Sequence, residues 1–198
     1  PIDSVRRIVN TSTGKTGWAI AEHLHRMGHD VVCLVGQTSS TPTFPLPDVR
    51  YDESPDGLLN ESIQVANSNP EPEFWIHAAA ILDYAPEYES GKTPSGIENW
   101  KIELSPTKKH IQALKEHVGG SMRIGFKLEV DADEETLISK SKSLISDNDL
   151  DAVVANLLDE VNGESTKRCR IVFPNGNVES ILDLSELCEA IEAIIASN

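Results

Sequence analysis

Apolar residues in the first part of the chain follow a helical pattern and then a strand pattern. From Trp18 to Met27 they recur at every third position, which places them on one face of a helix, and Gly28 is typical of a helix end. Residues 31–35 form a continuous apolar run, typical of a strand buried on both faces of a parallel sheet. The pattern predicts a helix followed by a buried strand.

The middle of the chain alternates between loops and short apolar runs. Residues 38–55 are rich in proline and small polar residues, which predicts an extended loop, and residues 58–67 predict a short helix. Residues 74–80 predict a strand that ends in three alanines, whose small side chains leave room for a ligand. Residues 85–98 are rich in Pro, Gly and Ser, so we expect a mobile loop there.

The second half of the chain continues this alternation. The expected order is a helix from its N-cap Thr107 to His117, a strand over 122–130, a helix over 134–145 capped by Asp133 and a buried strand over 151–156. Thr and Asp are suitable caps because their side-chain oxygens accept hydrogen bonds from the first turn of a helix.

The C-terminal part predicts a hairpin and a last helix. Residues 168–173 and 178–182 flank Asn175-Gly176, a strong hairpin-turn signal. Asp183 or Ser185 caps the final helix. The apolar residues on one side of this helix are Leu187, Ile191, Ile194 and Ile195.

Helices alternating with apolar strands predict one α/β domain over residues 1–198. We expect a three-layer, Rossmann-like, mostly parallel sheet with a C-terminal β-hairpin extension and a final helix. Ligands bind outside the carboxyl ends of the strands in such sheets. The Gly14 loop, residues 79–83 and Asn156 adjoin such ends, so we expect them to converge on one cleft.

The composition excludes several classes of function. The chain has 198 residues, 39% of them hydrophobic, and a net charge of −15. Nucleic-acid binding needs clustered Lys and Arg, so this charge argues against it. No apolar run is long enough to span a membrane and no signal-peptide pattern begins the chain, so we expect a cytoplasmic protein without a membrane partner.

The three cysteines show no metal-ligand spacing. Cys33, Cys169 and Cys188 lie far apart in the sequence. We expect each to be an inert, buried packing residue, and we predict no metal site formed by the protein.

A polar loop at the N-terminus has the layout of an anion-binding site. Residues 6–17 end in Gly14 and Gly17 and lead into the first predicted helix. Free amide groups at a helix start favour phosphate or carboxylate, and glycine lets a ligand approach the main chain. The spacing matches neither the P-loop nor the Rossmann fingerprint, so no generic nucleotide motif explains it.

Six segments together resemble one enzyme family. Residues 1–17 are similar to the segment that opens phosphopantothenate cysteine ligases, also called phosphopantothenoylcysteine synthetases. Five later segments resemble that family's motifs in the same order, namely 77–84, 92–95, 125–131, 142–145 and 155–156. The similarity covers essentially the whole chain and looks closest to the stand-alone bacterial form. Family members place a strand and a glycine-rich turn before this opening segment, so we expect both to be missing upstream of Pro1.

The resemblance implies a two-step ligation in coenzyme A biosynthesis. The carboxylate of 4′-phosphopantothenate attacks the α-phosphate of CTP, which releases pyrophosphate and leaves an acyl-cytidylate. The amine of L-cysteine then displaces CMP and forms an amide. Both steps need charge to be neutralised, which is the work of cations, amide donors and Mg²⁺.

The resemblance also implies three catalytic residues. Asn10 would hold the acyl-cytidylate for the second step, with Arg6 assisting at the same site. Lys92 would reach the nucleotide phosphates from a loop that closes over them. Taken singly, the same residues are explained by a helix-entry turn, a surface charge and an exposed loop lysine.

The nucleotide site that the resemblance implies is larger. Its members are Gly14, Ala79, Ala80, Asp83, Lys108, Lys109, His110, Ile111, Phe126 and Lys142. A turn Asp and a core Phe are the simpler interpretations of Asp83 and Phe126. The family has a second phosphate lysine where this chain has Ser146, and Lys140 or Lys109 is the candidate replacement.

Relatives build a homodimer in which each subunit completes the other's site. We therefore expect a homodimer in which the hairpin over 168–182 is the dimer element. The nucleotide remains open, because relatives from other lineages use ATP.

Two rival functions remain. Tyr88 and Lys92 have the Tyr-x-x-x-Lys spacing of an NAD(P)-dependent oxidoreductase, but Gly91 and Pro94 disfavour the helix that this pair requires. A catalytically impaired nucleotide- or flavin-binding module of the same fold is the second alternative.

Overall fold

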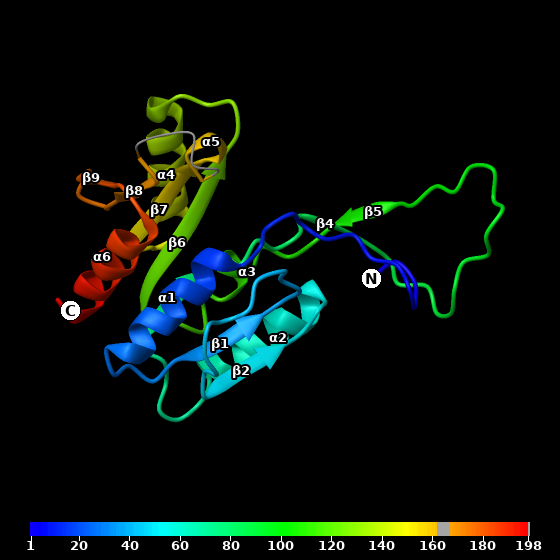
Figure 1. The fold of residues 1–198 in the computed structure, drawn as a ribbon, viewed down its shortest axis with the longest axis horizontal. Coiled ribbons are helices and arrows are strands. Elements are labelled where there is room, and N and C mark those ends of the chain that lie inside the picture. Colours follow the sequence, from blue (N-terminus) through cyan, green and yellow to red (C-terminus); the bar gives the residue numbers. More distant parts are fainter. Residues whose placement is uncertain (162–166, 198) are drawn as a thin grey trace.

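The computed structural model describes residues 1–161 and 167–197, and Figure 1 shows their arrangement. The helices are α1 (Lys15–Arg26), α2 (Pro55–Ala66), α3 (His110–Ala113), α4 (Glu134–Asn148), α5 (Leu158–Val161) and α6 (Leu184–Ala196). The strands are β1 (Val32–Val35), β2 (Asp48–Tyr51), β3 (Phe74–His77), β4 (Tyr84–Pro86), β5 (Leu104–Pro106), β6 (Met122–Glu129), β7 (Ala152–Leu157), β8 (Cys169–Val172) and β9 (Val178–Ile181).

The strands form a main sheet and two smaller ones. The main sheet has the order β3-β6-β7-β8-β9, in which β3, β6 and β7 run parallel and the hairpin β8–β9 adds antiparallel strands at one edge. β1 and β2 form a separate parallel pair, and β4 and β5 an antiparallel ribbon. The predicted α/β fold with a C-terminal hairpin and a final helix is confirmed, although the described strands do not join into one continuous sheet.

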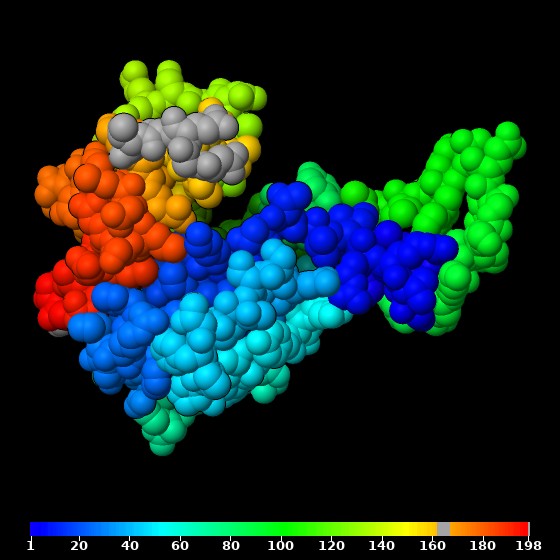
Figure 2. Space-filling model, viewed as in Figure 1, coloured from blue at the N-terminus to red at the C-terminus, as the bar shows by residue number. Residues whose placement is uncertain are grey.

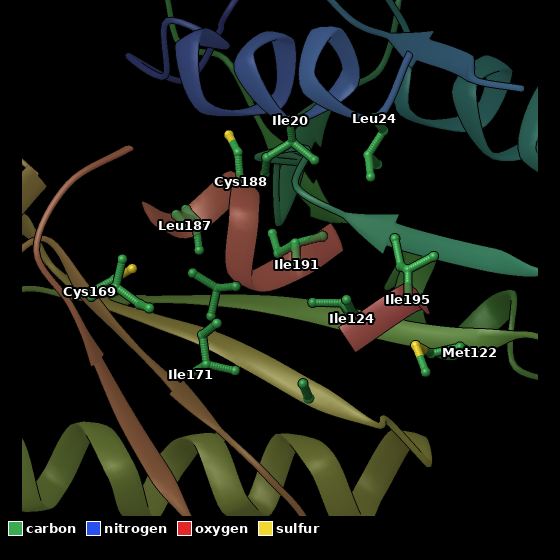
Figure 3. Packing of buried hydrophobic residues seen from close by; sticks show 13 residues of the cluster. Ile20, Leu24, Met122, Ile124, Cys169, Ile171, Leu187, Cys188, Ile191 and Ile195 are labelled. Atoms are coloured by element: carbon green, nitrogen blue, oxygen red, sulfur yellow. The ribbon is translucent and has the colours of Figure 1, made fainter. Parts of the chain in front are cut away.

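Helices cover both faces of the main sheet because successive residues of its central strand β7 are apolar and point to opposite faces. Ala152 and Val154 of β7 face the cluster that contains α1 and α6, whereas Val153 and Ala155 face α4. Figure 3 shows Ile20 of α1 lying over α6, with the strands beneath. This period of two is what a strand between two helical layers requires.

Three local predictions are wrong. Residues 38–55 are not a loop throughout, because β2 lies within them and pairs with β1. The β1 strand is not buried on both faces, since Val32 is 41% exposed at the open side of a two-stranded sheet. Thr107 caps no helix: its hydroxyl donates to the carbonyl of Leu82, and α3 begins only after Lys109.

Most other elements agree with the sequence pattern. Asp133 and Asp183 accept hydrogen bonds from Thr136 N and Glu186 N and so cap α4 and α6. All three cysteines are buried, as expected. Burial is the main cause that raises their thiol pKa values, to about 11 for Cys33 and Cys188 and about 12 for Cys169. Among the described residues, no helix has the length and apolar character needed to cross a bilayer.

Residues 84–106 form an arm that projects away from the sheets (Figures 1 and 2). Its first residues are not a loop, because Tyr84–Pro86 pairs with Leu104–Pro106. The N-terminal segment lies along the arm, and its buried Asp3 links the two. The Asp3 carboxylate accepts hydrogen bonds from Thr93 N at 3.0 Å and from Arg6 N at 2.8 Å. One buried carboxylate thus ties the arm to residues 1–7.

We expect Asp3→Asn to loosen the arm. Burial alone would raise the pKa of Asp3, but the hydrogen bonds from Val5, Thr93 and Arg6 lower it from 3.8 to about 2. A lowered carboxyl pKa stabilises the fold above pH 4, and this contribution is lost as the pH falls through 2. Limited proteolysis within residues 84–106 should be faster in Asp3→Asn than in the exposed-loop control Asp30→Asn, and wild-type protection should decline below pH 4. Equal cleavage rates would contradict this role.

Candidate functional site

Residues that follow three strands enclose one open hollow of about 120 Å³. Residues that directly follow β1, β2 and β3 line it, and the starts of α1 and α2 close it. The lining residues are 8–10, 12, 14, 36–38, 52–55, 58 and 78–82. The hollow lies where parallel α/β sheets bind their ligands, at the carboxyl ends of strands.

Gly14 brings the N-terminal loop against the wall of the hollow. Its φ of 79° is left-handed, and it is the N-cap of α1 without a side-chain hydrogen bond. A Cβ at this position would lie 2.5 Å from Cγ2 of Thr38, so only glycine allows this approach. The start of α1 therefore lies at the hollow, although the amide of its first residue, Lys15, already donates to Oγ1 of Thr13 at 3.3 Å.

Asn10 is held directly against the alanine wall. Its Nδ2 donates to the carbonyl of Ala80 at 2.7 Å. The side-chain Oδ1 and the second N–H stay available to a ligand, because an amide has two donors and an acceptor oxygen. The structure thus brings together four of the predicted residues, Asn10, Gly14, Ala79 and Ala80.

Asp83 and the segment 108–111 form the rim beyond this wall. The carboxylate of Asp83 pairs with the ammonium of Lys109, and its carbonyl accepts from Thr107 N at 2.9 Å. Both charged side chains are exposed. Of residues 108–111, Lys109 therefore meets Asp83, whereas Ile111 packs against the apolar cluster beneath α4.

Arg6 and Lys92 are not among the lining residues. The guanidinium of Arg6 pairs with Asp3 at 2.6 Å, donates to the carbonyl of Thr93 and lies over the ring of Trp100. Lys92 is exposed on the arm. Lys92 thus lies on the arm, and Arg6 lies against it.

Phe126, Lys142 and Asn156 also lie outside the hollow. Phe126 packs against the main core, and Lys142 is exposed on α4. Asn156 is buried in β7, which β6 separates from β3, so its predicted convergence on the cleft is wrong.

The candidate replacements for the second phosphate lysine already hold carboxylates. Lys140 pairs with Glu129 at 2.6 Å, and Lys109 pairs with Asp83. Ser146 donates to the carbonyl of Ser143 within α4. A phosphate would have to compete with these carboxylates for the two ammonium groups.

Residues 36–38 and 52–55 were missed from sequence. They follow β1 and β2, and the loop predicted over 38–55 concealed the second strand. The sequence did contain a signal for residues 36–38. Gly36 directly follows the apolar run that predicts a strand, and ligands bind at the carboxyl ends of such strands.

The wall of the hollow is acidic rather than basic. It contains Asp52 and Glu53, and its described lining includes no Lys or Arg. Glu53 pairs with Arg7 at 2.5 Å, and Asp52 accepts from Ser54 N at 2.8 Å. No group of three or more His, Cys, Asp or Glu in the described residues could hold a metal ion, so these side chains do not fit a protein-ligated metal centre.

Two histidines lie behind the wall. Burial, and then the charges of Arg123 and His110, lower the pKa of His77 to about 3, so its imidazole is neutral near pH 7. Burial also lowers the pKa of His110, against the carbonyl of Pro55 and the charge of Asp56, which raise it. Neither supplies a cation to the hollow at neutral pH.

The structure defines a Rossmann-like α/β protein with a candidate ligand site at the ends of its strands. The chain belongs to the family described as the C-terminal domain of DNA/pantothenate metabolism flavoproteins, whose pattern matches residues 1–196. The resemblance noted in the sequence is thereby confirmed.

Relatives and solved structures agree with this membership. The chain is 32% identical over 166 residues to the coenzyme A biosynthesis bifunctional protein CoaBC of Thermococcus kodakarensis, covering 84% of this chain but only 40% of that relative. The DNA/pantothenate metabolism flavoprotein of Streptococcus pneumoniae has a similar structure, with a TM-score of 0.84, 28% identity and coverage of 100% of this chain and 94% of that one. The C-terminal domain of a CoaBC protein has a TM-score of 0.76 at 25% identity, over 98% of this chain and 87% of that one.

Gly14→Ala should destabilise the chain more than Gly28→Ala at the other end of α1. Both glycines have positive φ, 79° and 94°, so both substitutions meet the same backbone cost of about 1–2 kcal/mol. Only the new methyl group at Gly14 would collide with Thr38, whereas nothing lies within 4 Å at Gly28. Urea unfolding measures the free energy of unfolding of each variant. Equal losses in the two variants would show that the close contact with Thr38 does not affect stability.

Proposed function

We propose that the chain joins 4′-phosphopantothenate to L-cysteine with CTP, through an acyl-cytidylate. The observation that carries this proposal is the hydrogen bond of Asn10 to Ala80 inside the hollow. It places a side-chain amide beside small residues at the carboxyl ends of the strands, in a family named for pantothenate metabolism. The proposal concerns this domain's reaction, since the chain spans 40% of the CoaBC relative.

In the first step, the substrate carboxylate attacks the α-phosphate of CTP and pyrophosphate leaves. The transition state gathers negative charge, which must be met by cations or amide groups. The acidic hollow offers the start of α1 at Gly14, and Lys109 stands at the rim beside Asp83. Further positive charge would come from Lys92 on the arm, from Arg6 against it, and from Mg²⁺ that enters with the phosphates of CTP.

In the second step, the cysteine amine attacks the acyl carbon, CMP leaves and the amine loses a proton. Asn10 is suited to hold the acyl-cytidylate, because one N–H is fixed by Ala80 while the rest of the amide faces the ligand. A fixed amide does not have to reorganise during the reaction, which is what stabilisation of developing charge requires.

The oxidoreductase alternative lacks its structural basis. Residues 88–92 are not helical, and Gly91 has a φ of 90°. The hydroxyl of Tyr88 lies 3.2 Å from Oγ of Ser4. The Tyr-x-x-x-Lys spacing therefore does not place Tyr88 and Lys92 on one helix face.

Asn10→Ala should stall the reaction after activation. We expect pyrophosphate release from CTP and phosphopantothenate to continue, the acyl-cytidylate to accumulate, and amide formation to fall by about 10²-fold or more. Lys92→Ala should instead slow pyrophosphate release itself. A coupled assay for pyrophosphate, with chromatography of the nucleotide products, separates the two steps.

Matched variants control for nonspecific effects. Asn67→Ala removes an exposed asparagine that likewise donates to a backbone carbonyl, that of Ile63 at 2.8 Å, and Lys101→Ala removes another exposed lysine of the arm. Both should react as wild type does. If the wild type binds CTP but releases no pyrophosphate, it is an impaired binding module. If NADPH but not CTP protects the protein, it is an oxidoreductase. Faster turnover with ATP than with CTP would show that ATP is the nucleotide.

We also propose a homodimer. The hairpin over 168–182 is one contact surface, since β9 is an edge strand with Val178 and Leu182 exposed. The arm is a second surface, because it exposes a set of large apolar side chains, namely Tyr84, Tyr88, Ile97, Trp100, Ile102 and Leu104. A second copy that covers the arm would bring the arm's cations close to a neighbouring subunit.

Sedimentation at micromolar concentration should show a dimer. If the arm is the contact surface, Trp100→Ser and Ile97→Ser should shift the equilibrium towards monomer. If the hairpin is the contact surface, Val178→Ser and Leu182→Ser should do so. Each Å² of apolar surface buried between subunits stabilises the dimer by about 25 cal/mol. Removing a large apolar side chain from the contact should therefore raise the dissociation constant measurably. A wild-type monomer would overturn the proposal.

A further inference from the structure

The nucleotide-contact segment 108–111 has little stability of its own. It includes the start of α3, which spans four residues, has no side-chain N-cap hydrogen bond and buries no residue. A helix this short does not persist in water without tertiary contacts. The position of Lys109 at the rim therefore depends on what holds α3 against the sheet.

A buried arginine of β6 supplies that contact. Arg123 is 3% exposed, and its Nη2 donates to the carbonyl of Ile111 while Nη1 donates to the carbonyl of Asn148 at 2.5 Å. Among the described residues no carboxylate lies within 4 Å of its guanidinium, although Asp149 and Asp151 are near enough to favour its charge, so the two carbonyls are its main partners and its Nε has none. A buried charge is costly unless it is hydrogen-bonded, and bonds from a charged donor are strong. If Ile111 moved away, the buried guanidinium would lose one of its two hydrogen bonds to backbone carbonyls.

Neighbouring groups fix the direction of Arg123. Its backbone N–H donates to Oδ2 of Asp151 at 2.7 Å, and its carbonyl accepts from Asp151 N at 2.9 Å. Nη2 also lies 3.5 Å from Nε2 of His77, which is neutral and can accept. His77 ends β3 immediately before the alanine wall, so the same guanidinium contacts both the residue that precedes this wall and the segment 108–111.

Gly125 receives the side chain of the same isoleucine. A Cβ at Gly125 would lie 3.3 Å from Cδ1 of Ile111 and 2.7 Å from Cδ1 of Leu150. β6 therefore contacts Ile111 in two ways. Arg123 donates to the carbonyl of Ile111, and the side chain of Ile111 packs over Gly125, which has no Cβ.

We propose that Arg123 is a positioning residue for the nucleotide, which acts by fixing Ile111 and with it Lys109 at the rim beside Asp83. This inference rests on the proposed function, because the nucleotide is its CTP. Arg123 touches no substrate. Its loss weakens CTP binding, while phosphopantothenate binds as before because Arg123 makes no contact with Asn10, the residue proposed to hold the acyl group.

The test compares Arg123→Met, Arg123→Lys and Gly125→Ala with Arg170→Met. Arg170 is a matched control: it is 2% exposed in β8 and pairs with Glu160 and Glu134, away from α3. We expect the Kd for CTP, measured by calorimetry, to rise about tenfold or more in Arg123→Met and Gly125→Ala and by less in Arg123→Lys. The KM for phosphopantothenate should change less than twofold, and Arg170→Met should bind CTP as wild type does even if it lowers the urea midpoint.

Hydrogen exchange gives a readout that does not depend on the reaction. Amide exchange in residues 107–114 should be faster in Arg123→Met and Gly125→Ala than in wild type and Arg170→Met. Unchanged exchange, unchanged CTP affinity, or equal loss of affinity in Arg170→Met would overturn the inference. A wild-type protein that binds no CTP would instead refute the proposed function, and exchange would still decide whether Arg123 fixes the segment.

Discussion

The meeting of the residues that follow β1, β2 and β3 is the constraint on which the site depends. These residues enclose a hollow with the starts of α1 and α2. Only small residues permit this meeting, as the contact of Gly14 with Thr38 and the alanines after β3 show. A ligand at this edge meets main-chain groups more readily than side chains.

Buried charges connect this edge to the rest of the molecule through backbone groups. Asp3 accepts from the amides of Val5, Arg6 and Thr93 and so attaches the arm, whereas Arg123 donates to two carbonyls and so attaches α3 and the end of α4. Such charges tolerate little displacement, because a lost partner leaves an unsatisfied group out of water. The segments that bear candidate nucleotide and phosphate contacts are therefore placed by polar contacts as much as by apolar packing.

The charged residues of the candidate site are separated: acidic side chains line the hollow, and the candidate catalytic cations lie outside it. Asp52 and Glu53 line the wall, while Lys92 lies on the arm and Arg6 contacts the arm from the N-terminal segment. A negative net charge keeps anions at a distance unless local groups oppose it. Under the proposed function, binding of two phosphate-bearing substrates requires the arm or a second subunit to contribute positive charge, so assembly and catalysis are linked.

Hydrophobic period, caps and the Asn175-Gly176 turn determined the α/β class, the β8–β9 hairpin and the boundaries of α6, because these features depend on neighbours in the chain. The same reasoning correctly joined Asn10 and Gly14 to Ala79 and Ala80, since parallel strands share a carboxyl edge. It failed for β2, which pairs with β1, for Thr107, whose hydroxyl donates to the carbonyl of Leu82, and for Asn156, which β6 separates from β3. Only the tertiary structure decided that Arg123 and Gly125 hold Ile111, because a buried guanidinium finds its carbonyl partners through packing that no local pattern records.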